Sequence, residues 1–427
     1  MIEHNEINFQ QFNTSASPRE LAPSIRFLIR TIRFLKPGET AYKLEFYERF
    51  LNYLRVIGLT ALVNNQDSLD KLNAKAPTFS HSFQEFLLHF GIIKQQNGRW
   101  IKNPKYIHFG ENQLIALMEE NKNPVNVNLT PGEQRLVDDF LFVRDLIKKY
   151  RQPDTDFKHI KKHGKTWEKL LKTNKLDYEI RLSETLFHLW KFQSESKIRS
   201  PFDEAYYTES GRSAFRNFTQ PLFQKYIQKL ADSIQPVKVF DLGCGYGNYV
   251  ELVRETLPHS KVTGVEINPE VYKITRDKFA DDPNVEIVNT DFFELQSGAK
   301  YDFVLMNYVL FYFSREDQKR VPEKAASLLN EGGSIILCQY FSGIESLKEQ
   351  LAEKQKEWTF FKKIVMHYSD KILYANTLWN DCVDTFSSAV QWDLFLKDLQ
   401  ESELYIRSMT HADPYYYSLF VEIKKLS

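Results

Sequence analysis

In the second half of the chain, short apolar runs alternate with segments whose apolar residues recur at helical spacing. The apolar runs predict β-strands at residues 237–242, 262–267, 285–288, 303–308 and 334–340, with helices between them at 249–257, 269–279 and 315–329. Strands that alternate with helices form a parallel sheet covered on both faces. Two further strands are predicted at 403–410 and 415–424, and the alternating pattern of the second is typical of a hairpin strand.

The first half of the chain shows a different pattern, dominated by helical spacing. Residues 21–62 predict two helices separated by Pro37-Gly38, and residues 68–100 predict a helix, a turn, a helix and a hairpin around Asn97-Gly98. Helices followed by a small hairpin indicate a winged-helix-like domain. Residues 1–20 are polar, and we expect a flexible N-terminus there.

Residues 106–200 are polar and rich in lysine, with helical patches at 136–147 and 182–192. The lysines between residues 158 and 175 predict either a solvated helix surface or a face that attracts phosphate groups. The predicted organisation is therefore a flexible N-terminus (1–20), a helical winged-helix-like dimerisation domain (21–105), a helical lysine-rich insertion or linker (106–200) and an α/β domain (201–427).

Composition and charge narrow the class of protein. Aromatic residues make up 14% of the chain and hydrophobic residues 42%, which excludes a disordered chain because there is ample apolar surface to bury. The net charge is zero, with an excess of eight positive charges before residue 201 and of eight negative charges after it. This balance argues against a nucleic-acid-binding chain as a whole.

The cysteine pattern and the hydropathy of the chain indicate the cellular compartment. The three cysteines lie far apart and lack the spacing of a metal site, which favours a reducing, cytoplasmic compartment and predicts no bound metal. The first residues have no secretory signal pattern, and the longest charge-free apolar run falls short of the ~20 residues that a membrane helix needs. We therefore expect a cytoplasmic protein without a membrane partner.

A glycine cluster follows the first strand of the α/β half, although glycine is scarce, with 16 residues in 427. The sequence there is Asp241-Leu242-Gly243-Cys244-Gly245-Tyr246-Gly247. Glycines at a strand-to-helix turn let a ligand approach the backbone closely. The G-x-G-x-G spacing differs from the G-x-G-x-x-G that seats a dinucleotide pyrophosphate, which disfavours a nicotinamide dehydrogenase. A tight turn without a ligand is the alternative.

Two carboxylates at the ends of the next strands indicate the ligand. Glu266 closes the second strand, where a carboxylate can accept hydrogen bonds from both ribose hydroxyls. Asp291 follows the third strand and can accept a hydrogen bond from an adenine amino group, and the ring of the adjacent Phe292 can stack on the base. The pattern predicts a site for adenosine without a diphosphate.

From residue 237 to the C-terminus, the chain resembles the class I S-adenosylmethionine-dependent methyltransferases. The resemblance is carried by the glycine cluster, the two carboxylates, the strand at 301–308 and the Asn330-Glu331-Gly332-Gly333 turn. The resemblance implies a Rossmann-like seven-stranded sheet whose last strand is antiparallel, with S-adenosylmethionine as cofactor and S-adenosylhomocysteine as product. The cofactor residues that it implies are Asp241, Gly243, Gly245, Gly247, Glu266, Asp291, Phe292, Asn307, Tyr207 and Arg212.

The chain also resembles a narrower family, the small-molecule O-methyltransferases with an N-terminal dimerisation domain. The resemblance lies in the winged-helix pattern and in two segments, Phe202…Tyr207…Arg212…Phe215 and Trp392-Asp393-Leu394-Phe395-Leu396. It implies a homodimer. That family has a catalytic histidine after the fourth strand, where this chain has Phe311. A phenyl ring cannot accept a proton, so the general-base step does not carry over.

Without that base, we expect methyl transfer through alignment and exclusion of water, to an acceptor that is already nucleophilic: an amine, a carbon or an acidic hydroxyl. His367 is the predicted alternative base, with a histidine at the surface or core edge as the other interpretation. Aromatic side chains predict a cage for a ring or a cation, with ordinary core packing as the alternative. The predicted substrate-binding residues are Tyr308, Phe311, Tyr312, Tyr340, Tyr368 and Trp379.

Other functions stay open at this point. The chain could methylate RNA or protein with the help of the lysines at 158–175, or hold the cofactor without transferring the methyl group. A winged helix that binds DNA is a further alternative, but residues 80–90 contain no lysine or arginine to contact phosphates.

Overall fold

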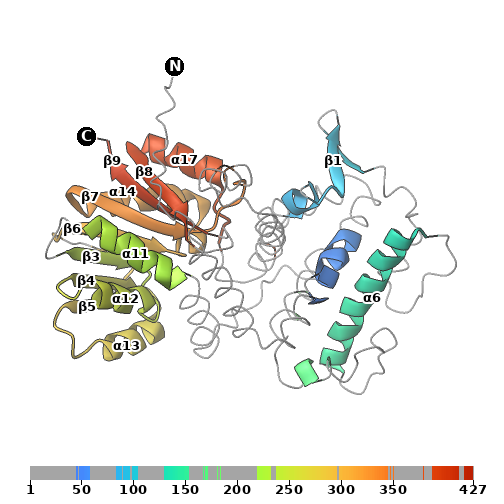
Figure 1. The fold of residues 1–427 in the computed structure, drawn as a ribbon, viewed down its shortest axis with the longest axis horizontal. Coiled ribbons are helices and arrows are strands. Elements are labelled where there is room, and N and C mark those ends of the chain that lie inside the picture. The colour runs from blue at the N-terminus through green and yellow to red at the C-terminus, as the bar shows by residue number, and fades with distance from the viewer. Residues whose placement is uncertain are drawn as a thin grey trace, which may run out of the picture. The chain divides into compact units, whose positions relative to one another are not determined.

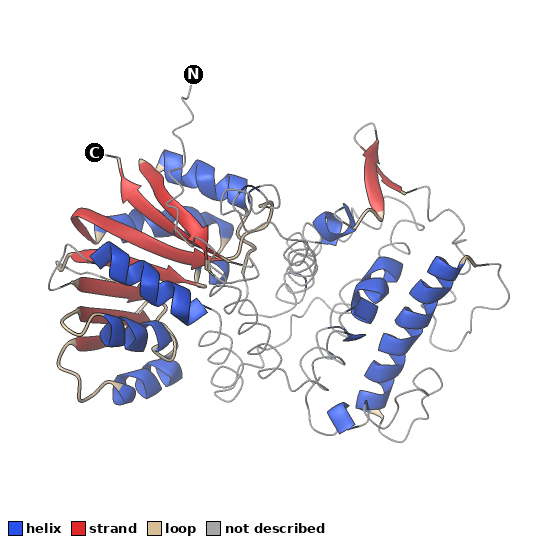
Figure 2. Ribbon diagram, in the orientation of Figure 1, coloured by secondary structure: helices blue, strands red, loops and turns tan. Residues whose placement is uncertain are grey.

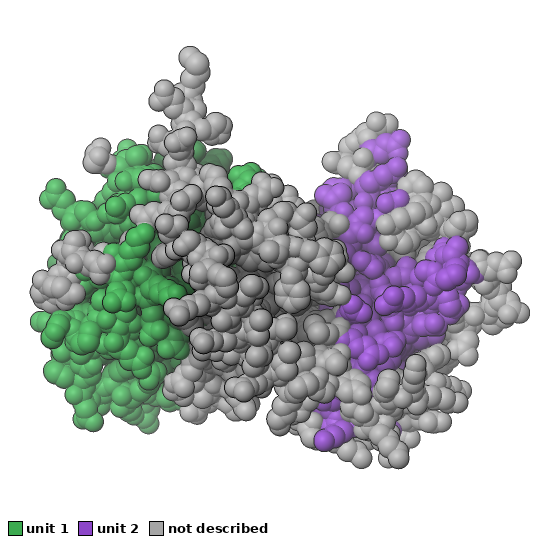
Figure 3. Space-filling model, in the orientation of Figure 1, with its two compact units in different colours: residues 1–15, 202–370, 386–427 green, residues 16–201, 371–385 purple. Residues whose placement is uncertain are grey.

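The computed structural model divides the chain into two compact units (Figure 3). One comprises residues 1–15, 202–370 and 386–427, and the other residues 16–201 and 371–385. The structure describes residues 45–46, 48–57, 83–88, 90–96, 99–103, 129–152, 167, 169–171, 180, 183, 219–231, 237–295, 298–344, 347, 350, 378, 387–412 and 418–426.

The C-terminal unit is built on a seven-stranded sheet (Figure 1). Its strands lie in the order β5-β4-β3-β6-β7-β9-β8, where β9 is antiparallel to both of its neighbours and the pairs from β5 to β7 are parallel. The order and the antiparallel last strand confirm the predicted Rossmann-like α/β fold. The strands are β3 (Lys238–Leu242), β4 (Lys261–Glu266), β5 (Val285–Asn289), β6 (Tyr301–Asn307), β7 (Leu329–Gln339), β8 (Leu404–His411) and β9 (Leu419–Lys425).

Helices connect the parallel strands (Figure 2). Asn268 caps α13 by accepting from the backbone of Glu270 at 3.0 Å, and Ser314 caps α14 by accepting from Asp317 N at 3.1 Å; such caps stabilise a helix by about 1 kcal/mol each. The helices are α11 (Gln220–Ala231), α12 (Asn248–Thr256), α13 (Pro269–Lys278), the short 3-10 helix η4 (Leu310–Tyr312), α14 (Arg315–Ser327) and α17 (Trp392–Glu401).

One face of the sheet packs against α11 and α12 through a single hydrophobic cluster. Phe223 from α11, Val253 from α12 and Leu305 from β6 are all fully buried in it. Val239, Phe303 and Leu305 belong to this cluster, whereas the equally buried Phe240 and Val304 do not, as the alternation of side chains along a strand requires.

The start of β7 differs from the prediction. The residues predicted as the end of a helix and a turn, Leu329 to Gly333, instead form the first part of the strand. Gly332 has a φ of 74°, and the pairing with β6 shifts register between Tyr301 and Phe303. A positive φ at glycine inside an irregular strand is typical of a bulge, which looks like a turn in the sequence.

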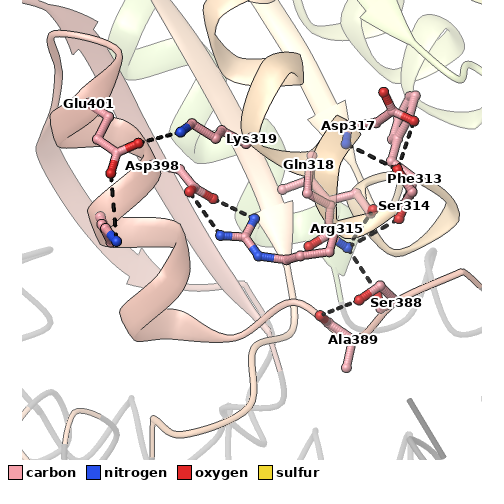
Figure 4. A network of polar contacts seen from close by, with 12 residues as sticks. Phe313, Ser314, Arg315, Asp317, Gln318, Lys319, Ser388, Ala389, Asp398 and Glu401 are labelled. Carbon is pink, nitrogen blue, oxygen red and sulfur yellow. Dashed lines mark hydrogen bonds and ion pairs between the residues drawn. The ribbon is translucent and has the colours of Figure 1, made fainter. Parts of the chain in front are cut away.

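Polar contacts hold α14, α17 and η4 together (Figure 4). The Arg315 guanidinium donates to both carboxylate oxygens of the buried Asp398 at 2.6 and 2.8 Å. Gln318 Nε2 donates to the backbone carbonyls of Leu310 at 3.1 Å and Ser388 at 2.9 Å. A bidentate pair gives a fixed geometry, so this network positions η4 at the end of β6.

The N-terminal unit contains the long helix α6 (Pro131–Arg151), which begins with a capping box between Thr130 and Glu133. Strands β1 (Ile93–Gln96) and β2 (Arg99–Lys102) pair antiparallel, which confirms the hairpin predicted at Asn97-Gly98. The predicted winged-helix arrangement extends over residues outside the described ones and stays a prediction. In the described part of the chain, no helix has the length and apolar character that a membrane span requires.

Candidate functional site

The three glycines after β3 adopt backbone conformations that other residues rarely take. Gly243, Gly245 and Gly247 have φ values of 65°, 52° and 73°. A Cβ atom at Gly243 would lie 2.8 Å from Val309 Cγ2, and one at Gly247 would lie 2.4 Å from Phe279 Cε2. At Gly245 the nearest atom to such a Cβ is a backbone oxygen 4.0 Å away. Two of the glycines thus allow close packing, and the third borders open space.

Glu266, the last residue of β4, is bound to this glycine loop. Its Oε2 accepts a hydrogen bond from Gly245 N at 3.1 Å, and its Oε1 accepts one from Asn268 N at 2.8 Å. Burial raises the pKa of this carboxyl group, although the backbone donors oppose the shift. The carboxylate therefore lies beside the glycine loop, at the carboxyl end of the sheet.

Asp241 lies on β3, two residues before the glycine loop. Its side chain is 1% exposed, and its Oδ2 atom has no hydrogen-bond partner. Burial, with a further contribution from the negative charge of Glu266, raises its pKa to about 8. A buried carboxyl group in this environment favours a cation as its neighbour, because a positive charge offsets both effects.

Asn307 ends β6, the strand next to β3. It is 7% exposed, and neither its Oδ1 nor its Nδ2 has a hydrogen-bond partner. Leu305 pairs with Asp241 in the sheet register, and Asn307 lies two residues further on, so Asn307 and Asp241 are on the same face. Buried polar atoms are normally satisfied. Two adjacent strands therefore end in polar groups that a ligand with an ammonium and a carboxylate group would satisfy.

The two residues predicted to bind adenine lie just after β5, and Ile267 follows the neighbouring strand β4. Asp291 is half-buried and its Oδ1 accepts from Phe293 N at 2.7 Å. Phe292 is 3% exposed, and its ring centroid lies 6.1 Å from that of Phe240. Ile267, which directly follows Glu266, is 67% exposed. The hydrophobic pattern assigned Ile267 to the end of the strand predicted at 262–267, so its exposure was not predicted.

Aromatic side chains gather at the carboxyl ends of β6 and β7. The rings of Phe311 and Tyr340 stack with centroids 5.2 Å apart and an interplanar angle of 24°, and Tyr312 lies 4.5 Å from Phe311. The Phe311 carbonyl accepts from Ser387 N at 2.9 Å, which ties η4 to the loop before α17. Tyr308, between β6 and η4, has its ring 6.5 Å from that of Tyr340. The structure thus brings four of the predicted substrate-binding residues together.

Five predicted site residues lie outside the described residues: Tyr207, Arg212, His367, Tyr368 and Trp379. Within the described part of the chain, no group of three His, Cys, Asp or Glu residues could hold a metal ion.

Comparisons with known proteins identify the class. Residues 239–333 match the family model described as "Methyltransferase domain". Over 183 residues the chain is 24% identical to an uncharacterized methyltransferase of Alkaliphilus oremlandii. The match covers 41% of this chain and 79% of that protein. It is 31% identical over 180 residues to a malonyl-[acyl-carrier protein] O-methyltransferase of Acetivibrio thermocellus, covering 41% of this chain and 61% of that protein. The chain spans about half the length of other malonyl-[acyl-carrier protein] O-methyltransferases that it matches.

Among solved structures, the O-methyltransferase family 2 protein from Planctomyces limnophilus, in complex with apigenin, has the same fold. The TM-score is 0.50 at 14% identity, and the match covers 89% of this chain and 94% of that one. The α/β unit is therefore a class I S-adenosylmethionine-dependent methyltransferase domain, as the glycine motif predicted. S-adenosylmethionine is its cofactor, and the unpartnered Asp241 and Asn307 and the open space at Gly245 suit a phosphate-free adenosyl cation.

The raised pKa of Asp241 predicts that cofactor binding depends on pH. In the free protein this carboxyl group is protonated below pH 8, and a bound cation favours its ionised form, so binding releases a proton. The affinity for S-adenosylmethionine should therefore rise with pH, by about tenfold between about pH 6 and about pH 7. Isothermal titration across this range measures the slope. The Asp241→Asn variant, which cannot ionise, should bind more weakly and lose most of the slope; an equal slope in both proteins would contradict the assignment.

Proposed function

We propose that this protein transfers the methyl group of S-adenosylmethionine to a small-molecule acceptor that is already nucleophilic, namely an amine, a carbon or an acidic hydroxyl. The observation that carries the proposal is the environment of η4. Where a histidine base would stand in the similar O-methyltransferases, Phe311 is 9% exposed and stacked on Tyr340. A position filled by packed aromatic rings excludes water and provides no proton acceptor.

In this mechanism the chain acts by positioning. The bound cofactor supplies an electrophilic methyl group on a positively charged sulfur, and the transfer removes that charge. Asp241 and Glu266 bind the ammonium and ribose ends, and the glycine loop lets the cofactor approach the backbone closely. The aromatic residues of η4, with Tyr340 directly after β7, hold the acceptor and keep water away from it. Alignment of this kind accounts for up to about 7–11 kcal/mol of a barrier in favourable cases.

The relatives differ in the molecules for which they are named. The structural relative was solved with apigenin, whereas the sequence relatives are named for malonyl-[acyl-carrier protein] and for the synthesis of carboxy-S-adenosyl-L-methionine. The stacked pair of Phe311 and Tyr340 and the 39% exposed Tyr312 favour a flat, apolar acceptor over a charged carboxylate.

The proposal is tested with S-adenosylmethionine carrying a labelled methyl group and a panel of aromatic amines, phenols of graded acidity and enolisable carbon acids. We expect transfer to at least one class, with rates among the phenols that follow the fraction ionised. Transfer to RNA or protein alone would overturn the proposal. Cofactor binding without any transfer would instead support a chain that holds the cofactor and has lost the reaction.

A substitution at η4 tests the absence of a base. Because Phe311 takes no proton, Phe311→His should leave activity within about threefold of wild type at neutral pH. Any decrease in activity should come from the loss of the buried phenyl ring and its packing. Initial rates on the best acceptor of the panel measure this effect, and Phe311→Leu serves as the control for ring volume. A large gain in rate for weakly acidic hydroxyls in the histidine variant alone would show that a missing base limits the enzyme.

A further inference from the structure

Tyr308 has an unusual backbone conformation for a large aromatic residue. Its φ is 52°, and among the described non-glycine residues only Glu403 shares a positive value. The left-handed region is costly for a bulky side chain, so it persists where surrounding contacts hold it. Tyr308 directly follows Asn307 and directly precedes Val309, whose side chain covers Gly243.

This conformation changes the direction of the side chains at the end of β6. In a regular strand, consecutive residues face opposite sides of the sheet. Asn307 faces the cluster of α11 and α12, because Leu305, two residues earlier, belongs to that cluster. Tyr308 packs against the same cluster. The left-handed residue therefore puts two consecutive side chains on the face that carries Asp241.

Two hydrogen bonds hold Tyr308 in this position. Its backbone N donates to the carbonyl oxygen of Cys338 on β7 at 2.7 Å. Its phenol oxygen donates to Ser418 Oγ at 2.9 Å, and Ser418 is the fully buried residue just before β9. The C-terminal hairpin, far away in the sequence, thus fixes the turn that carries Asn307.

We propose that Tyr308 is a positioning residue for cofactor binding: its hydroxyl pair with Ser418 keeps the chain in the left-handed turn and thereby aims the unpartnered amide of Asn307 at the methionine end of S-adenosylmethionine. Without the pair, residue 308 relaxes toward extended backbone and rotates the peptide that carries Asn307. The proposal rests on the cofactor assignment and does not depend on the acceptor.

The test uses the full chain and needs no acceptor. Isothermal titration with S-adenosylmethionine should show five- to tenfold weaker binding for Tyr308→Phe and for Ser418→Ala. The double variant should bind no more weakly than the weaker single variant, because both remove the same bond. In an Asn307→Ala background, Tyr308→Phe should have no further effect, which distinguishes positioning from a general loss of stability.

Tyr405→Phe is the matched control, since Tyr405 is 37% exposed on β8, away from the carboxyl end of β6, and its hydroxyl should be dispensable. Thermal melts should place all variants within a few degrees of wild type. Unchanged affinity in Tyr308→Phe, or a loss that adds fully to that of Asn307→Ala, would overturn the proposal. Wild-type protein that fails to bind the cofactor would overturn the methyltransferase assignment itself, a distinct outcome.

Discussion

Glu266→Ala is expected to weaken S-adenosylmethionine binding by about a hundredfold or more. The carboxylate is the predicted acceptor for both ribose hydroxyls, and hydrogen bonds to a charged group contribute about 1.5–3 kcal/mol each. The same carboxylate accepts from Gly245 N, so its loss also loosens the loop that lines the site. Isothermal titration of wild type and variant measures the difference directly.

Two further variants make this experiment specific. Glu270→Ala removes an exposed carboxylate four residues away on α13 and should leave the affinity unchanged. Glu266→Gln keeps the shape but removes the charge, which should also lower the pKa of Asp241 toward its ordinary value, since Glu266 helps to raise it. An affinity for Glu266→Ala equal to that of wild type would mean that the ribose is bound elsewhere.

The sequence was sufficient to predict the sheet, because hydrophobic periodicity depends on burial alone. Strands β3, β4, β5 and β6 lie within a few residues of their predicted positions. The beginning of β7 could not be predicted, since a bulge that contains Gly332 and Gly333 has the composition of a turn. The pairing of β7 with β6 depends on contacts between residues far apart in the sequence, and hydrophobic periodicity gives no information about such contacts.

The candidate site was predictable where a residue type is rare and its spacing regular. The three glycines met that condition, and Glu266 was identified by its place at the end of the next strand. The structure places Glu266 in direct contact with Gly245. Ile267 and Tyr308 did not meet it. An exposed isoleucine and a left-handed tyrosine are visible only when exposure and backbone angles are known, because nothing in their residue type distinguishes them from core residues.

The structure also assigns different physical roles to the three glycines of the motif. A Cβ at Gly247 or Gly243 would collide with Phe279 or Val309, so alanine at either position disturbs the packing of the loop itself. Gly245 has no such neighbour, and its backbone is held by Glu266 and by Thr275, whose hydroxyl donates to Gly245 O at 2.6 Å. Substitution at Gly245 can therefore separate binding from folding.

Gly245→Ala is expected to abolish cofactor binding while the protein stays folded. The positive φ makes alanine unfavourable by about 1–2 kcal/mol, which lowers the midpoint of thermal unfolding by only a few degrees. The new methyl group, however, projects into the open space beside Glu266 that the cofactor must fill, and we expect affinity to fall by about a hundredfold or more, as for a displaced close contact. Gly332→Ala is the matched control. Gly332 also has a positive φ, 74°, and no atom lies within 4 Å of a Cβ there, but this residue lies near the start of β7. Equal thermal destabilisation of both variants, with binding lost only in Gly245→Ala, is the expected result. If both variants bind S-adenosylmethionine as wild type does, the space at Gly245 is not where the cofactor lies.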